Sequence, residues 1–256
     1  MLTFEGNLLA TTGDIRVEGE QHLREIPQGK NVIILTTHIS DIDVPAAVSV
    51  VGRHFDIAIT NMSYQHSFLK DPAISTALHI AGKKHFIPID YARVAGENRG
   101  AFNPDNYPAM REALRAGKAV VIPGHNPSKQ WQLSKGGYGA AYLADITENS
   151  IIVPVSVNVK KVVSSGENRK ENTVVNMRNR PDVDIYIGKP FEMDRVERMD
   201  DMARIMQKRS AGEYLTDEDV ERFHALSKIL RQQSDMMMRK LAEPLPEDKK
   251  GLYAGA

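Results

Sequence analysis

Three histidines in the sequence are each followed five positions later by an aspartate, a combination that can supply a general base held by a carboxylate. The three pairs are His38/Asp43, His66/Asp71 and His85/Asp90. At least two of the pairs must be incidental, so the spacing alone selects no site. The second pair begins an expected helix with no strand before it. The third pair lies in or at the start of an expected strand, where a structural histidine is more typical.

The surroundings of His38 favour the first pair. The segment 31–37, NVIILTT, is apolar and β-branched, which predicts a buried strand, and His38 follows it directly. A helix is expected to begin near Asp43. In open α/β sheets, sites gather at the carboxyl ends of strands. We therefore expect His38 to act as a general base with Asp43 as its carboxylate. The alternative is that Asp41 or Asp43 only caps the following helix.

Short apolar runs alternate with helical patterns between residues 31 and 188. Strands are expected at 31–37, 55–60, 84–89, 118–123, 151–157 and 183–188. Helices are expected at roughly 43–52, 66–80, 104–116 and 136–146. Because the strands are apolar throughout rather than alternating, we expect both faces of the sheet to be covered. The sequence thus predicts an α/β fold with a mostly parallel central sheet flanked by helices.

The C-terminal part has a different pattern, which predicts a helical extension. Apolar residues recur at three- and four-residue steps through 196–210 and 216–244. Thr216 and Asp219 form a variant of the capping box, and Pro244 marks the end of the long helix. We expect this helix to pack against the protein's own core. Contact of its Met/Leu stripe with a membrane is the alternative.

These patterns divide the chain into two parts and exclude several kinds of chemistry. We expect an α/β domain at 1–195 and a helical C-terminal extension at 196–256, packed on the same domain. With 33 Lys+Arg and 33 Asp+Glu, the charge indicates no nucleic-acid partner. The absence of cysteine excludes disulfides and thiolate chemistry. With no visible signal peptide or spanning segment, we expect a cytoplasmic protein, and we consider peripheral contact with the inner face of the membrane.

The segment around His38 resembles the first motif of the glycerolipid acyltransferase family, the group that contains the 1-acylglycerol-3-phosphate acyltransferases. That motif is His-x-Ser-x-x-Asp, and the sequence has His38, Ser40 and Asp43 at its positions. Segments similar to the family's later motifs follow in its order at 83–91, 119–144 and 151–158. The resemblance covers roughly residues 15–160 and implies an α/β acyltransferase.

Two of the later motifs lack the arginines that the family is thought to use on the phosphate of the acceptor. Pro-Ile-Asp-Tyr follows Phe86-Ile87, and Pro123-Gly124-His125-Asn126 stands where Pro-Glu-Gly-Thr-Arg is usual. Arginine suits phosphate because its planar fork binds two oxygens at once. The resemblance implies a glycerol-phosphate-type lipid precursor as acceptor. The two departures leave a phosphate-free hydroxyl or amine open.

The resemblance implies acyl transfer from acyl-CoA or acyl carrier protein, with no other cofactor and no metal. His38 would take the proton of the acceptor as it attacks the thioester carbonyl, and Asp43 would orient His38. No acyl-enzyme is needed, because the thioester is already activated. Backbone amides near Gly124 or at Gly136-Gly137 are candidate donors to the oxyanion. We do not expect a metal at His38, Asp41 and Asp43, because no second cluster of ligands is present.

Further side chains are expected to bind the substrates. His125 and Asn126 follow a predicted strand and are expected at the same end of the sheet as His38, to contact the acceptor or only to form a turn. Ser40 positions the loop or forms a simple turn. The expected substrate-binding residues are Ser40, Gly124, His125, Asn126, Lys129 and Lys135. The partners would be an acyl thioester donor and a lipid-like acceptor. A non-catalytic lipid-binding protein is the alternative from another class, supported by the changed motifs.

Overall fold

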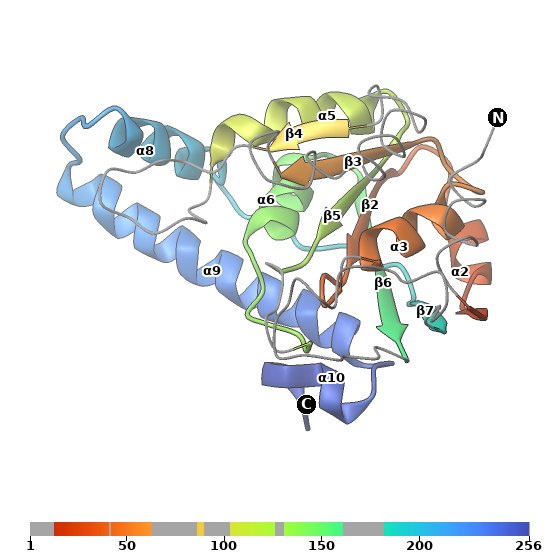
Figure 1. The fold of residues 1–256 in the computed structure, drawn as a ribbon. Coiled ribbons are helices and arrows are strands. Elements are labelled where there is room, and N and C mark those ends of the chain that lie inside the picture. Colours follow the sequence, from red (N-terminus) through yellow and green to blue (C-terminus); the bar gives the residue numbers. More distant parts are fainter. Residues whose placement is uncertain are drawn as a thin grey trace, which may run out of the picture.

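A seven-stranded sheet forms the centre of the molecule, with the strand order β1-β7-β6-β2-β5-β3-β4 (Figure 1). The computed structural model describes residues 13–40, 42–62, 86–89, 103–125, 131–160 and 182–255. The strands are β1 (Ile15–Glu18), β2 (Asn31–Thr36), β3 (Ile57–Met62), β4 (Phe86–Ile89), β5 (Ala119–Pro123), β6 (Ser150–Val159) and β7 (Val183–Ile187). Neighbouring strands are parallel except β6 and β7, which are antiparallel. The predicted α/β fold with a mostly parallel sheet is confirmed.

Helices cover both faces of this sheet (Figure 1). One face carries α2 (Gln21–Arg24) and α3 (Asp43–Val51). The other side carries α5 (Tyr107–Arg115), α6 (Gly139–Ile146), α8 (Asp200–Ser210) and α9 (Asp217–Ala242). Three single turns complete the described helices: η3 (Pro104–Asn106), α10 (Glu247–Lys250) and η4 (Gly251–Tyr253).

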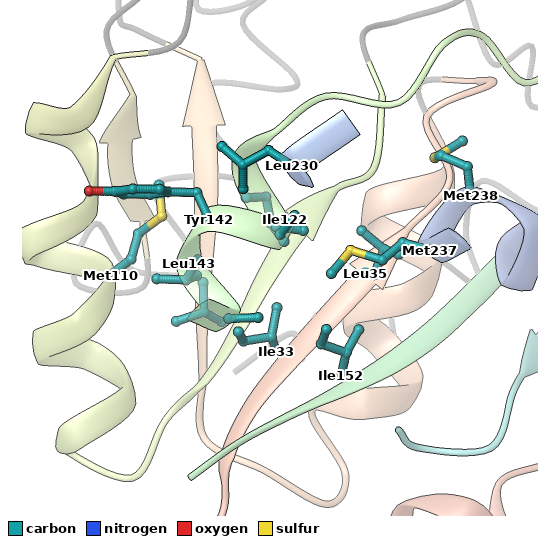
Figure 2. Close-up of a cluster of buried hydrophobic side chains, with 14 of the residues drawn as sticks. Ile33, Leu35, Met110, Ile122, Tyr142, Leu143, Ile152, Leu230, Met237 and Met238 are labelled. Carbon is teal, nitrogen blue, oxygen red and sulfur yellow. The ribbon is translucent and has the colours of Figure 1, made fainter. Parts of the chain in front are cut away.

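The central strand β2 contributes to two separate hydrophobic cores. Ile33 and Leu35 point into the core beneath α5, α6 and α9, while Val32 and Ile34 point into the core beneath α3. Figure 2 shows Ile33 and Leu35 in the first core, with Met237 beside Leu35. Because successive side chains of a strand point to opposite faces, a strand covered on both sides must be apolar at every position. This requirement explains the unbroken apolar run of the sequence.

The long helix α9 packs against the protein's own core, as predicted. Its capping box is present: the Asp219 N–H donates to Thr216 Oγ1 at 3.1 Å, and the Thr216 N–H donates to Asp219 Oδ2 at 3.4 Å. Leu226, Leu230 and Leu241 are at most 1% exposed. The stripe of α9 is therefore covered by protein along most of its length. The domain boundary at residue 195 stays a prediction.

The remaining elements agree with the predicted ranges except at particular points. All six predicted strands are present, but the short edge strand β1 was not predicted from apolar runs, since only its Ile15 and Val17 are apolar. The helix expected at 136–146 begins at Gly139, because Gly136 instead forms an antiparallel bridge with His125. The helix expected at 66–80 lies outside the described residues.

Candidate active site

The loops that follow β2 and β5 start at the same end of the sheet and then run to opposite faces. The two strands are parallel neighbours, so their carboxyl ends lie side by side. The chain continues from β2 into α3 on one face and from β5 into α6 on the other. Such divergence marks the point at which open α/β sheets bind ligands. His38 follows β2 and His125 follows β5, so both lie at this point.

His125 supports the backbone of the loop that carries His38. The His38 N–H donates to His125 Nε2 at 3.1 Å, and His125 Nδ1 lies 3.1 Å from Ser134 Oγ. Because Nε2 accepts a hydrogen bond, the neutral ring carries its proton on Nδ1 and donates it to Ser134. The side chain is 3% exposed. These contacts fix His125 beneath the His38 loop. That His125 contacts the acceptor or forms a turn stays a prediction.

Asp43 closes the same loop from its other end. It is the first residue of α3, and its side chain is fully buried. Its Oδ2 accepts a hydrogen bond from the Ile39 N–H at 2.8 Å. Its Oδ1 accepts one from the Ser40 N–H at 3.2 Å and another from the Ser40 hydroxyl. The carboxylate thus binds donors that precede the helix and is not the helix N-cap, which is Ile42. The catalytic pairing of Asp43 with His38 stays a prediction.

The burial of Asp43 changes its proton affinity. Loss of hydration raises the pKa of Asp43 to about 6, although hydrogen bonds from Ser40, Thr37 and the amide of Ile39 favour the charged form and oppose this rise. At neutral pH the group is therefore mainly a carboxylate. A pKa in this range allows the loop to change its charge within reach of physiological pH.

The amides expected to stabilise an oxyanion are bonded to protein atoms. The Gly124 N–H donates to Thr36 O at 2.8 Å, and the Gly137 N–H donates to Gly124 O at 2.9 Å. The Gly136 N–H donates to the hydroxyl oxygen of Tyr253 at 3.3 Å. Gly124 is also buried, and a Cβ at this position would lie 3.0 Å from side-chain atoms of Met238 and Leu241 in α9. Of these three amides, only that of Gly136 bonds to the C-terminal segment. That one of them holds the oxyanion stays a prediction.

The structure describes only some of the other predicted site residues. Ser40 is 8% exposed and bonds to Asp43, which supports its role in positioning the loop. Lys135 is exposed. Asp41, Asn126 and Lys129 lie outside the described residues, so their predicted roles stay predictions.

A small pocket, partly open to solvent, lies beside the His38 loop. Its walls are formed by Ile39, Ser40, Asp43, Trp131, Val157, Asn158, Val159 and Lys249. We did not predict Trp131, Asn158 or Lys249 as site residues. They come from three distant segments, so only folding brings them to the loop. The only hint in the composition was that Trp131 is the single tryptophan of the chain, which could have drawn attention to it as a site residue.

In the described residues, no group of three or more His, Cys, Asp and Glu side chains could hold a metal ion. In the same ranges, no helix combines the length and the apolarity required to cross a bilayer.

Comparisons with known proteins give little direct guidance. No protein-family model matches the chain, and no curated protein matches it. Among solved structures, the chain is similar to the 1-acyl-sn-glycerophosphate (LPA) acyltransferase PlsC from Thermotoga maritima, with 12% sequence identity and a TM-score of 0.44. The similarity covers 88% of this chain and 72% of the other. A similarity this weak assigns neither an activity nor a substrate to the chain.

Proposed function

We propose that the protein is an acyltransferase that moves a fatty acyl group from acyl-CoA or acyl carrier protein to a hydroxyl acceptor, with His38 as general base. The observation that carries the proposal is the placement of the His38 loop at the carboxyl end of the central strand β2, where buried Asp43 fastens it. A base is effective when its position is fixed relative to the reacting atoms. The bonds from Ile39 and Ser40 to Asp43 support this role for the loop.

In the proposed reaction, the acceptor oxygen attacks the thioester carbonyl while His38 takes its proton. The new C–O bond forms, the C–S bond breaks, and the sulfur leaves as a thiol after taking back a proton from the imidazolium. The carboxylate of Asp43 favours this charged intermediate form of His38. The acceptor that we expect is a glycerol-phosphate-type lipid precursor, at the inner face of the membrane or in the cytoplasm.

A second candidate acceptor is a hydroxyl or amine without phosphate. It is favoured by the absence of arginine from Phe86–Ile89 and from Pro123–His125, where the resemblance would place phosphate-binding arginines. A non-catalytic lipid-binding protein is the candidate from a different class.

The proposal is tested by measuring free thiol released from acyl-CoA and from acyl carrier protein, with phosphate-bearing and phosphate-free acceptors. His38→Ala is expected to reduce the release by about 10²–10⁴-fold, the usual contribution of a general base. This substitution removes the ring but keeps the His38 N–H, which makes the bond to His125. The fold should therefore be unchanged by circular dichroism.

His224→Ala is the matched control, since His224 is exposed on α9. Its thiol release should equal that of the wild type. If His38→Ala retained wild-type turnover, the mechanism would be wrong. If no donor and acceptor pair released thiol from the wild type, a lipid-binding function would replace the enzymatic one.

A further inference from the structure

We propose that the pocket beside the His38 loop binds a small anionic group, a carboxylate or a phosphate, with Lys249 as its cation and Asn158 as its hydrogen-bond donor. The inference rests on the proposed function in one respect, since the anionic group is taken to be part of the acyl acceptor. It adds residues from the C-terminal segment to the site. Of the pocket residues named here, Lys249 lies outside the part of the chain that resembles an acyltransferase, and Trp131 and Asn158 lie within it.

Asn158 is a buried polar side chain in the pocket wall. It is 7% exposed, and within the part of the chain that the structure describes its side-chain amide makes no hydrogen bond. The Ser156 hydroxyl donates to Leu241 O at 2.7 Å, so Ser156 faces α9. Because side chains of a strand alternate, Asn158 faces the same side, toward the segment that follows α9. Because Asn158 lines the pocket, its side-chain amide can donate a hydrogen bond to an anion bound there.

Lys249 brings a positive charge to the same pocket. Its side chain is 21% exposed, and Nζ lies 3.8 Å from Asp248 Oδ2. Asp248 is 74% exposed, so solvent screens this pair and it holds the ammonium weakly. The neighbouring Lys250 differs, because its Nζ makes a 2.8 Å ion pair with Glu247 and it does not line the pocket. Of the two lysines on α10, Lys249 is the one placed to meet a ligand.

The third wall, Trp131, is held in an unusual backbone conformation. Its φ of 57° lies in the left-handed region, which a bulky residue keeps only where the surroundings impose it. The C-terminal segment supplies part of this constraint: the Leu133 N–H donates to Lys249 O at 2.8 Å. Trp131 and Lys249 therefore keep a fixed relation across the pocket, and the indole gives an apolar surface for the carbon skeleton of a ligand.

The position of the pocket links the anion to the proposed chemistry. Ile39 and Ser40 belong both to the pocket wall and to the loop that follows His38, so a hydroxyl near the bound anion comes within reach of that loop. Asp43 also lines the pocket, but its oxygens are already bonded to Ile39 and Ser40, which partly balances its charge. The anion must therefore be drawn by Lys249.

The identity of the cation determines the class of ligand. A lysine ammonium is a compact point charge and does not select the planar, two-pronged contact that an arginine makes with phosphate. A site built on Lys249 accepts carboxylate and phosphate alike. It would also give the chain a cation for its acceptor although the arginines of the second and third motifs are absent.

The test measures binding without any thioester, so that it is independent of catalysis. Calorimetric titration of the full chain with glycerol 3-phosphate, glycerate and glycerol separates the two anions from a neutral molecule of the same skeleton. Both anions should bind and glycerol should not. Quenching or enhancement of the single tryptophan, Trp131, places the ligand in the pocket.

Lys249→Gln should weaken binding of both anions by about tenfold or more, because the cation is lost, while Lys249→Arg should keep most of it. Lys250→Gln is the matched control on the same helix and should bind like the wild type. Asn158→Asp is a second variant, which adds a negative charge to the pocket and should also weaken binding. Thermal unfolding of each variant identifies any that fail to fold.

The inference is overturned if neither anion binds the wild type, or if Lys249→Gln and Asn158→Asp bind as Lys250→Gln does. Binding of only one anion would support the site and name its ligand class. Thiol release in the assay above without anion binding would overturn this inference alone. Anion binding without thiol release would overturn the proposed catalysis and leave the anion site standing.

Discussion

Two buried aspartates of this protein have opposite surroundings. Asp43 is fully buried, and the hydrogen bonds described for its carboxylate come from neutral donors, the amides of Ile39 and Ser40 and the side chains of Ser40 and Thr37. Asp219 is 5% exposed, and its carboxylate bonds to Arg204 Nη1 at 2.9 Å and to Lys208 Nζ at 2.8 Å. One carboxylate joins a loop to its own helix, whereas the other joins α8 to α9.

Because of these surroundings, the pKa values of the two carboxylates are shifted in opposite directions. Burial raises the pKa of Asp43 to about 6. The hydrogen bond from Lys208, followed by that from Arg204, lowers the pKa of Asp219 well below its usual range. Asp219 therefore stays charged at any physiological pH and serves the fold. Asp43 can exchange a proton close to neutrality, which is the property expected of a group in an active site.

Substitution of Asp43 should have the largest effect on activity. Asp43→Asn keeps the size of the side chain but removes the charge, and its amide group cannot accept both N–H bonds that the carboxylate accepts. We expect kcat/KM for thiol release to fall by about a hundredfold or more, as when a histidine loses its carboxylate partner. In the wild type, activity should decrease as the pH falls through about 6, where Asp43 takes up a proton. A variant with wild-type rate and pH profile would contradict this role.

Substitution of His125 should have a smaller effect, because His125 is a positioning residue. His125→Leu leaves the partly buried His38 N–H without its acceptor. Loss of this hydrogen bond costs about 1–3 kcal/mol. If the loss displaces the His38 loop, kcat should fall roughly tenfold. His125→Gln can place an oxygen near the former Nε2 and should recover most of the rate. Equal rates for the two variants would rule out positioning through this bond.

The pH dependence of stability should differ in sign between the two aspartates. The folded pKa of Asp43, about 6, exceeds the ordinary value of 3.8, so the native state binds more protons between these values. Its contribution is complete below about pH 4 and is lost, by roughly 3 kcal/mol at most, as the pH rises through 6. Urea unfolding at several pH values should show this loss in the wild type and not in Asp43→Asn.

Asp219 should show the opposite trend and no effect on catalysis. Its folded pKa is lowered, so its contribution is present above the ordinary value of 3.8 and is lost as the pH falls below it. At neutral pH, Asp219→Asn should lower the thermal midpoint by a few degrees, because Arg204 and Lys208 lose their partner. Thiol release should remain that of the wild type. A large loss of activity would show that α8 and α9 take part in the site.

Much of the fold was predictable because its signals are local. The apolar runs around Ile33 and Val121 need only their own composition to indicate strands with two covered faces. The capping box of Thr216 and Asp219 was also predictable, since both partners lie within one helical turn. The start of α6 at Gly139 was not, because the preceding residues are held by His125 and Tyr253 from other parts of the chain.

The candidate site also has one part that the local sequence predicts and another part that it does not. By itself, the sequence determined the loop of His38, Ser40 and Asp43, because its hydrogen bonds join residues three and four positions apart. Only the tertiary structure decided that His125 lies under this loop and that Lys249 lies beside it. Those contacts depend on strand order and on the docking of the C-terminal segment, which no short-range pattern encodes. The physical reason is that contacts between distant segments are selected by the packing of the whole molecule and not by the residues that happen to meet.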